Sequence, residues 1–317
     1  MSVTLPSDRE LTRELTALLN EGGFARGDVV ILERELNIHP GSYPNEIVRC
    51  TLPAGDELEL LCKYGFRDTV ATGHGAYGSR RGVEYEAAVY RQVLAPSPLS
   101  APRFYGSRTR PDDGDAWLVV EFVGRDPRIS LHPDAMTEAA RWLAAFHGIH
   151  TGKTADFDFL TVWDRGYYRG YVDRAVLFLG RLGHERRYLE ELQDRFDDWT
   201  DPLLRRPTVV HGEFYPDNVL YRNGRIYPVD WESAAIGAAA VDLATLTEQW
   251  EPEVVERCEE AYCLARWGAD TPADFHQCLL AARLFVACRW LGEPGKSAEH
   301  ARRLADLRRL AREVGVQ

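Results

Sequence analysis

The sequence lacks any apolar run that approaches the length of a membrane-spanning helix, which excludes a protein anchored by such helices. Its first residues carry Asp, Glu and Arg where a secretory signal needs an apolar core. Cysteine is scarce, with six residues in 317, and no C-x-x-C pair occurs. This pattern favours reduced, mostly buried thiols over a disulfide framework. We therefore expect a cytoplasmic protein without a membrane partner.

Positive charge is also in deficit, because the formal net charge is −11. Such a balance argues against a general nucleic-acid-binding protein. No internal repeat or low-complexity tract is evident. A hydrophobic content of 45% and a charged content of 27% are ordinary globular values. The length exceeds that of one typical domain and suits two lobes around a cleft. A monomer and a homodimer both fit these observations.

The most informative stretch is Thr208–Ala244, where a short apolar run leads into His-Gly-Glu. Asn218 follows five residues after Glu213, and Asn223–Gly224 then separates two strand-like runs. Asn-Gly in that position predicts a tight β-hairpin, because both residues tolerate positive φ. The hairpin would bring Asn218 beside Asp230 at its open end. Two carboxylates and an amide oxygen converging there would suit Mg²⁺ and phosphates.

These motifs resemble those of the protein-kinase-like superfamily, in particular its aminoglycoside phosphotransferase and choline kinase branch. That branch typically reads H-G-D-x-x-x-x-N, then a hairpin, then I-D-W/F-E and a later D-L-A. The matching residues are His211, Gly212, Asn218, Asp230, Trp231, Glu232, Asp242, Leu243 and Ala244. One position departs, since Glu213 stands where the branch usually has a catalytic Asp. The resemblance extends over about Val30 to Trp290.

The resemblance implies a bilobal α+β fold of the protein-kinase-like type. A small, β-rich, nucleotide-binding N-lobe would occupy residues 1–123, and a larger, mainly helical C-lobe residues 124–317. Strand-like segments are found at Asp28–Leu36, Glu46–Leu52, Leu58–Tyr64 and Trp117–Val123. Helical patterns occur at Asp134–His150, Val162–Leu182, His184–Asp198, Pro252–Trp267, Pro272–Gly292 and Ala298–Val314.

Lys63 and Glu86 are predicted to form an ion pair. Lys63 ends the third strand-like segment, and Glu86 lies inside the apolar stripe of a predicted helix at Arg81–Leu94. A carboxylate in that stripe needs a cation, because burying an unpaired charge is costly. The family places a Lys–Glu pair here, with the Lys reaching the α and β phosphates of the nucleotide. The alternative is two unrelated surface charges.

Two further segments are candidates for nucleotide contacts. Asn37–Asn45, between the first two strands, lacks G-x-G-x-x-G, yet its Gly41 and Ser42 could turn amides and a hydroxyl toward phosphate. A plain hairpin connection is an equal alternative for this segment. The backbone from Glu121 to Val123 resembles the inter-lobe hinge, where it would bond the purine base.

The resemblance assigns the remaining roles within the catalytic loop. Glu213 would orient the acceptor hydroxyl and accept its proton, and Asn218 with Asp230 would coordinate Mg²⁺. His211 would support the loop, and Asp242 would anchor it. The implied activity is ATP- or GTP-dependent O-phosphotransfer to a small hydroxylated molecule, such as an aminoglycoside, an amino sugar or another natural product.

Two alternatives remain at this stage. A catalytically weak or inactive kinase-fold protein that binds nucleotide or a small ligand is motivated by Glu213. A metal-dependent hydrolase using His211, Glu213 and Asp217 is disfavoured, because their spacing fits no familiar zinc motif. A cationic acceptor would suit the acidic segments Glu185–Asp201 and Glu248–Glu260, although solvated acidic faces are commoner. The aromatic residues between Phe157 and Tyr171 could line the acceptor site, although a core role is the commoner one.

Overall fold

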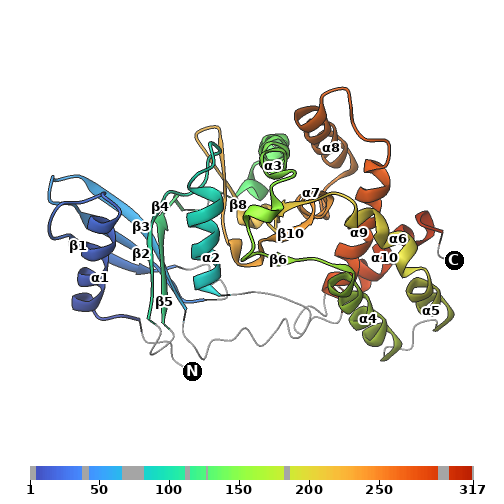
Figure 1. Cartoon of the computed structure of the whole chain (residues 1–317), viewed down its shortest axis with the longest axis horizontal. Helices are drawn as coiled ribbons and strands as arrows, with labels where there is room; N and C mark the ends of the chain where they lie inside the picture. The colour runs from blue at the N-terminus through green and yellow to red at the C-terminus, as the bar shows by residue number, and fades with distance from the viewer. Residues whose placement is uncertain are drawn as a thin grey trace. The chain divides into compact units, whose positions relative to one another are not determined.

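The computed structural model describes residues 5–37, 43–65, 82–110, 115–125, 128–181, 186–291 and 300–315. These residues form two compact units (Figure 1). The first unit contains the described residues up to 125 and also residues 222–232, and the second contains the remainder. The lobe boundary at residue 123 stays a prediction, and residues 222–232, which the sequence assigns to the C-lobe, belong to the first compact unit.

The first unit is built on an antiparallel sheet of five strands in the order β1-β2-β3-β5-β4. The strands are β1 (Val30–Leu36), β2 (Asn45–Thr51), β3 (Glu57–Gly65), β4 (Phe104–Thr109) and β5 (Ala116–Glu121). Helix α1 (Asp8–Glu21) and helix α2 (Val83–Val89) lie on opposite sides of this sheet (Figure 1). A π-helical turn, Tyr90–Leu94, continues α2. The fourth strand escaped prediction, since its sequence contains a β-bulge and few apolar residues.

Alternation along β3 decides which side chains meet which helix. Leu60, Cys62 and Tyr64 belong to the hydrophobic core that the leucines of α1 complete. Residues in between point to the other face. There, a Cβ atom added to Gly65 would lie 3.0 Å from Val83 of α2. The same face carries Lys63, which is therefore directed toward α2, as the alternation predicts.

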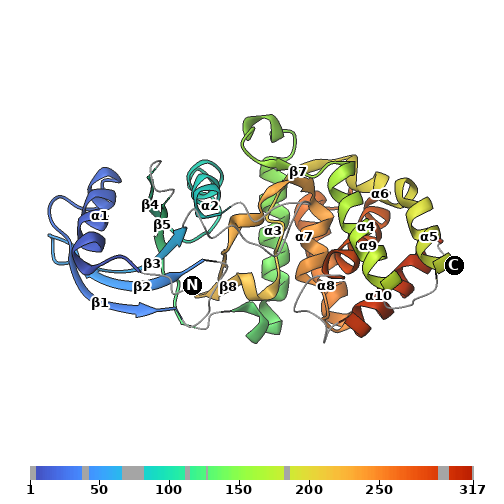
Figure 2. The ribbon, with the colours of Figure 1, turned by 90° about the horizontal axis from the view of Figure 1, so that it is seen from below.

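The second unit is mainly helical. Its helices are α3 (Met136–His150), α4 (Arg165–Arg181), α5 (Arg186–Asp194), α6 (Phe196–Leu204), α7 (Ala239–Leu246), α8 (Pro252–Trp267), α9 (Phe275–Trp290) and α10 (His300–Glu313). Helix α9 packs against α4, α6, α7 and α10, and α3 packs against α8 (Figure 2). A small sheet of β6 (Thr161–Val162), β10 (Ala235–Ala238) and β7 (Pro207–Val210) accompanies them.

The predicted hairpin is confirmed. Strands β8 (Val219–Arg222) and β9 (Arg225–Pro228) form a two-stranded sheet around Asn223 and Gly224. Both turn residues have positive φ, 52° and 76°, as a tight turn of this kind requires. The chain therefore reverses direction where the sequence predicts it.

Aromatic residues after α3 belong mostly to the core. Trp163, Tyr167, Tyr168 and Tyr171 are buried and surround Phe285 of α9. Their burial favours the core role over direct contact with an acceptor. In the part of the chain that the structure describes, none of the helices combines the length and the apolar character that crossing a membrane requires.

Candidate active site

Lys63 and Glu86 form a buried ion pair. The Lys63 ammonium lies 2.6 Å from Oε2 of Glu86, and the two side chains are only 7% and 4% exposed. Burial alone would lower the pKa of Lys63, but the carboxylates of Asp230 and Glu86 reverse this effect and raise the pKa well above its ordinary value. The structure thus favours the pair over two unrelated surface charges.

Asp230 is the second carboxylate bonded to Lys63. Its Oδ1 lies 2.5 Å from the ammonium, and its side chain is 26% exposed, unlike the buried pair beside it. The backbone of Asp230 has φ of +67°, in the left-handed region that few residues other than glycine adopt. The N–H of Trp231 donates to Oε1 of Glu86 at 3.2 Å. Glu86 therefore holds both Lys63 and the backbone next to Asp230.

The loop that begins after β7 has a backbone that only glycine can follow. Gly212 has φ of +86°, and a Cβ atom there would lie 2.3 Å from the carbonyl oxygen of Ser233. Asp242 of α7 is fully buried and accepts hydrogen bonds from the N–H groups of His211 and Gly212, at 2.7 and 2.8 Å. One buried carboxylate thus determines how the loop leaves the sheet.

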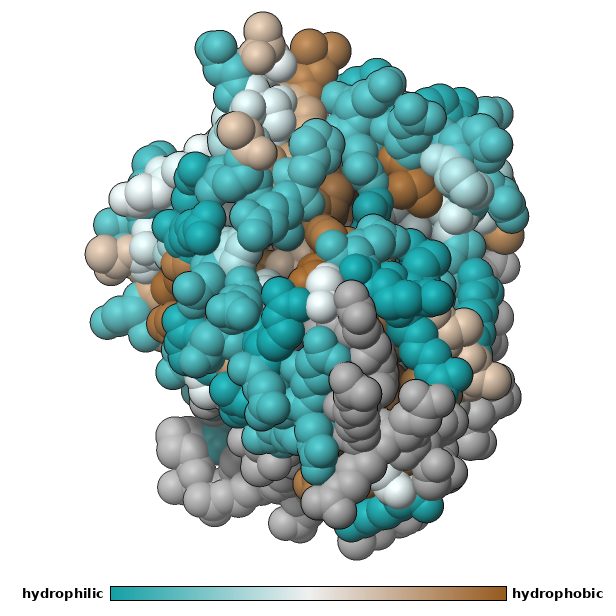
Figure 3. Space-filling model, turned by 90° about the vertical axis from the view of Figure 1, so that its right-hand side faces the viewer, coloured by the Kyte–Doolittle hydropathy of each residue, from teal (hydrophilic) through white to brown (hydrophobic). Residues whose placement is uncertain are grey.

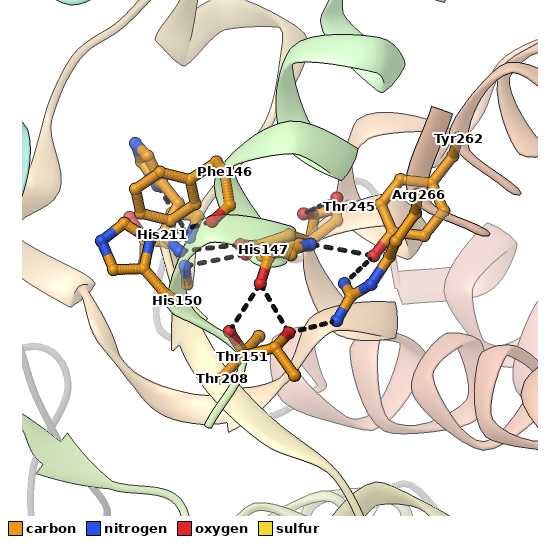
Figure 4. A network of polar contacts seen from close by, with 12 residues as sticks. Phe146, His147, His150, Thr151, Thr208, His211, Thr245, Tyr262 and Arg266 are labelled. Atoms are coloured by element: carbon orange, nitrogen blue, oxygen red, sulfur yellow. Dashed lines mark hydrogen bonds and ion pairs between the residues drawn. The ribbon is translucent and has the colours of Figure 1, made fainter. Parts of the chain in front are cut away.

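A polar network around His147 reaches Tyr262 and Arg266 of helix α8 (Figure 4). His147 Nε2 lies 3.1 Å from Oδ2 of Asp242, and His147 Nδ1 lies 3.0 Å from the hydroxyl of Tyr262. Arg266 donates to that same hydroxyl oxygen. Burial lowers the pKa of His147 to about 4, although Asp242 acts in the opposite direction. A neutral His147 that donates from Nε2 to Asp242 and accepts at Nδ1 from Tyr262 satisfies each hydrogen bond of this network.

Glu213 is buried and paired with a cation that the sequence did not predict. Its Oε1 lies 3.0 Å from Nη2 of Arg289, which comes from the last turn of α9. Arg289 also donates from Nη1 to the carbonyl oxygen of Gly212. The N–H of Glu213 donates to Nδ1 of His211 at 3.2 Å. Both ends of the Glu213 residue are therefore held by the protein.

Asn218 lies in a 3₁₀ turn, Pro216–Asn218, after Glu213. Its side-chain nitrogen donates to the carbonyl oxygen of Glu213 at 3.0 Å. With the nitrogen directed to the loop, the amide oxygen is the atom that could bind a cation. Asn218 and Asp230 belong to different compact units, so their shared metal site stays a prediction.

The hydrolase alternative gains no support from these contacts. Asp217 accepts from the Ser130 hydroxyl at 3.0 Å and lies 3.8 Å from Arg128. Glu213 is paired with Arg289, and Nδ1 of His211 accepts from the backbone. The three proposed hydrolase residues thus have separate partners.

The predicted nucleotide contacts outside Lys63 are only partly described. Ser42 lies outside the described residues. At the predicted hinge, the N–H groups of Glu121 and Phe122 donate to the carbonyl oxygens of Arg103 and Glu59, at 2.8 and 3.1 Å. The carbonyl oxygen of Val123 accepts from Arg222 at 3.0 Å. A purine base would therefore have to use other backbone groups of this segment.

Several acidic residues of the second unit pair with arginines. On α6, Asp197 and Asp201 lie 2.7 and 2.6 Å from the guanidinium of Arg165. In the other acidic segment, Glu248 pairs with Arg303 and Glu259 with Arg283. The view onto the end of the second unit shows a mainly hydrophilic surface with small apolar patches (Figure 3). These pairs weaken the case for an acidic surface dedicated to a cationic acceptor.

The family model described as "Phosphotransferase enzyme family" matches residues 70–275, which is more than half of the chain. The chain belongs to the phosphotransferase enzyme family. That match includes Glu86 and the entire loop from His211 to Asp242. Among curated proteins, none matches this sequence.

Several solved structures share the fold of this chain. Choline kinase LicA from Streptococcus pneumoniae has 14% identity and a TM-score of 0.61, covering 95% of this chain and 99% of its own. Macrolide 2'-phosphotransferase MphH from Brachybacterium faecium has 17% identity and a TM-score of 0.55, covering 92% and 97%. Aminoglycoside 2'-phosphotransferase-IIIa, solved as a GDP complex, has 15% identity and a TM-score of 0.55, covering 96% and 97%. The predicted protein-kinase-like fold of this phosphotransferase family member is confirmed.

Replacing Lys63 by methionine should destabilise the protein. The change leaves Glu86 buried without a cation, which commonly costs about 3–5 kcal/mol in the free energy of unfolding. Urea denaturation measures this loss. The matched control is Arg49→Met in β2, which removes an exposed pair with Glu33 and should cost about 0–1 kcal/mol. Equal stability of the two variants would show that Lys63 is a surface residue in solution.

His147 should make the protein less stable as the pH falls from about 6.5 to about 4, the pKa of the folded-state imidazole. In this range the unfolded chain binds a proton that folded His147 excludes, so acid favours unfolding. His147→Gln should therefore reduce the slope of unfolding free energy against pH in this window. His150, which is also buried and whose pKa is also lowered by burial, retains some slope. An unchanged slope, with the exposed His276→Gln as control, would mean that His147 is protonated in the fold.

Proposed function

We propose that this protein transfers the γ-phosphoryl group of ATP or GTP to a hydroxyl group of a small molecule. The observation that carries the proposal is the ammonium of Lys63, held between Glu86 and the partly exposed Asp230. A fixed cation beside a carboxylate suits a nucleotide whose phosphates carry a metal ion. Membership of the phosphotransferase enzyme family and the GDP bound by a solved relative support the same activity.

Each residue of the site would have a separate role. Lys63 would bind the α and β phosphates, and Glu86 would orient it. Asp230 and Asn218 would supply the oxygen ligands that Mg²⁺ prefers, and Mg²⁺ would neutralise phosphate charge when bound. Glu213 would orient the acceptor hydroxyl. As the acceptor oxygen bonds to the γ-phosphorus, the bond to the β-phosphate oxygen breaks, the nucleoside diphosphate leaves, and Glu213 takes the hydroxyl proton.

A second candidate is a kinase-fold protein that binds nucleotide without efficient transfer. The observation that favours it is the ion pair between Glu213 and Arg289, because Arg289 binds one oxygen of the proposed base. We favour transfer, because Gly212 and Asp242 shape the loop closely around Glu213. The acceptor panel below separates the two candidates.

Replacing Asp230 by alanine should abolish binding of Mg²⁺–ATP and leave the fold intact, since Glu86 still neutralises Lys63. Isothermal titration calorimetry measures binding, and the exposed Asp56→Ala serves as the control. The chain has only three lysines, Lys63, Lys153 and Lys296, so a lysine-acylating ATP analogue that marks Lys63 provides a second readout. If Asp230→Ala binds Mg²⁺–ATP as tightly as the wild type, Asp230 is not a ligand of the metal.

Wild-type protein should phosphorylate at least one member of a panel with labelled ATP and GTP. The panel takes its classes from the solved relatives, with an aminoglycoside, a macrolide and choline, and adds free amino sugars. Glu213→Gln should lower the transfer rate by about 10²–10⁴-fold, the usual contribution of a positioned general base.

The control for this experiment is Asp217→Asn, an exposed change in the same loop, which should retain the wild-type rate. A Glu213→Gln rate equal to a measurable wild-type rate would exclude Glu213 as the base. Tight binding of Mg²⁺–ATP without transfer to any panel member would favour the binding protein.

A further inference from the structure

Arg289 is a buried cation in the last turn of α9, and three aromatic rings lie near its guanidinium. The centre of its guanidinium lies 5.9 Å from the ring centroids of Trp163, Tyr171 and Trp290. The side chain is 3% exposed, and its Nε has no hydrogen-bond partner among the described residues. Aromatic faces attract a cation only weakly compared with an anion. Among the residues that the structure describes, Glu213 is the carboxylate that pairs with this guanidinium.

The same end of α9 holds the loop at three points. Arg289 bonds the carboxylate of Glu213 and the carbonyl oxygen of Gly212. The neighbouring Trp290 donates from its indole nitrogen to the hydroxyl of Tyr215 at 2.6 Å. Asp242 of α7 holds the same loop by its N–H groups. The loop is thus fixed from two helices, and α9 is the one that reaches the side chain of Glu213.

We propose that Arg289 is a positioning residue for Glu213. This inference rests on the proposed function, in which Glu213 acts on the acceptor hydroxyl. With Oε1 bonded to Arg289 and the backbone N–H bonded to His211, the direction of the second carboxylate oxygen is set. Free rotation of a long side chain would otherwise spread that oxygen over several rotamers.

The distance between backbone and Arg289 fits glutamate and does not fit aspartate. An aspartate at position 213 has one methylene less, which withdraws the carboxylate by roughly 1 Å along the chain. The Oε1–Nη2 contact of 3.0 Å would then exceed hydrogen-bond length. Glu213→Asp, the change toward the residue that related sequences usually carry, is therefore expected to damage this protein.

The test is a double-mutant cycle on transfer rate, with the panel acceptor that wild type phosphorylates fastest. Arg289→Met should lower kcat by about 100-fold, the scale of a misplaced catalytic group, and change KM for ATP by less than about twofold. Glu213→Asp should lower kcat to a similar extent. Arg289→Met added to Glu213→Asp should cost less than about threefold more, because the contact is already lost.

Two further measurements separate positioning from general structural support. Added guanidinium ion should restore part of the kcat that Arg289→Ala loses. The control is Arg283→Ala, which removes an arginine of the same helix that pairs with Glu259, and its kcat should not rise when guanidinium ion is added. Arg289→Met removes the cation that pairs with Glu213 and could unfold the protein. If it does, Glu213→Asp provides the decisive comparison. If Glu213→Asp keeps the wild-type kcat, or if the two mutations lower kcat by fully additive amounts of free energy, the positioning role of Arg289 is overturned and the proposed function is not. Absence of transfer by wild type overturns the proposed function, and the positioning role with it.

Discussion

A charge removed from water needs an opposite charge or a set of hydrogen bonds, and the candidate site is organised by this constraint. Lys63 on β3 meets Glu86 on α2 and Asp230 after the hairpin, a residue 167 positions further along the chain. In the second unit, Arg289 meets Glu213 across 76 positions. Each pair joins segments that lie far apart in the sequence, and each buried charge is balanced by its partner.

The backbone of the loop after β7, which carries Glu213, is held by buried hydrogen bonds. Asp242 binds two backbone N–H groups, and a neutral His147 binds Asp242 in turn. Because His147 also accepts from Tyr262, the network runs from the loop through α3 to α8. A chain of donors and acceptors that are all satisfied is rigid, since breaking any bond would leave a buried polar atom without a partner.

Glu213 has to be examined in its surroundings. In the sequence, a glutamate at the position where the resemblance predicts an aspartate admits both an active enzyme and an inactive binding protein. The surroundings supply a cation of matching reach on α9, and a glycine that lets the loop pass close to Ser233. A long carboxylate that is held at both ends behaves differently from a long carboxylate that is free.

The sequence by itself determined the local features of this protein. Strand alternation directed Lys63 toward α2, and Asn223–Gly224 produced the hairpin, because such preferences depend on a few neighbouring residues. The partner of Lys63 was also predictable, since a carboxylate in an apolar helical stripe requires a cation. Only the tertiary structure decided that Arg289 meets Glu213. An arginine at the end of an apolar helix indicates that a buried anion exists, but which anion it meets depends on how α9 packs against the loop.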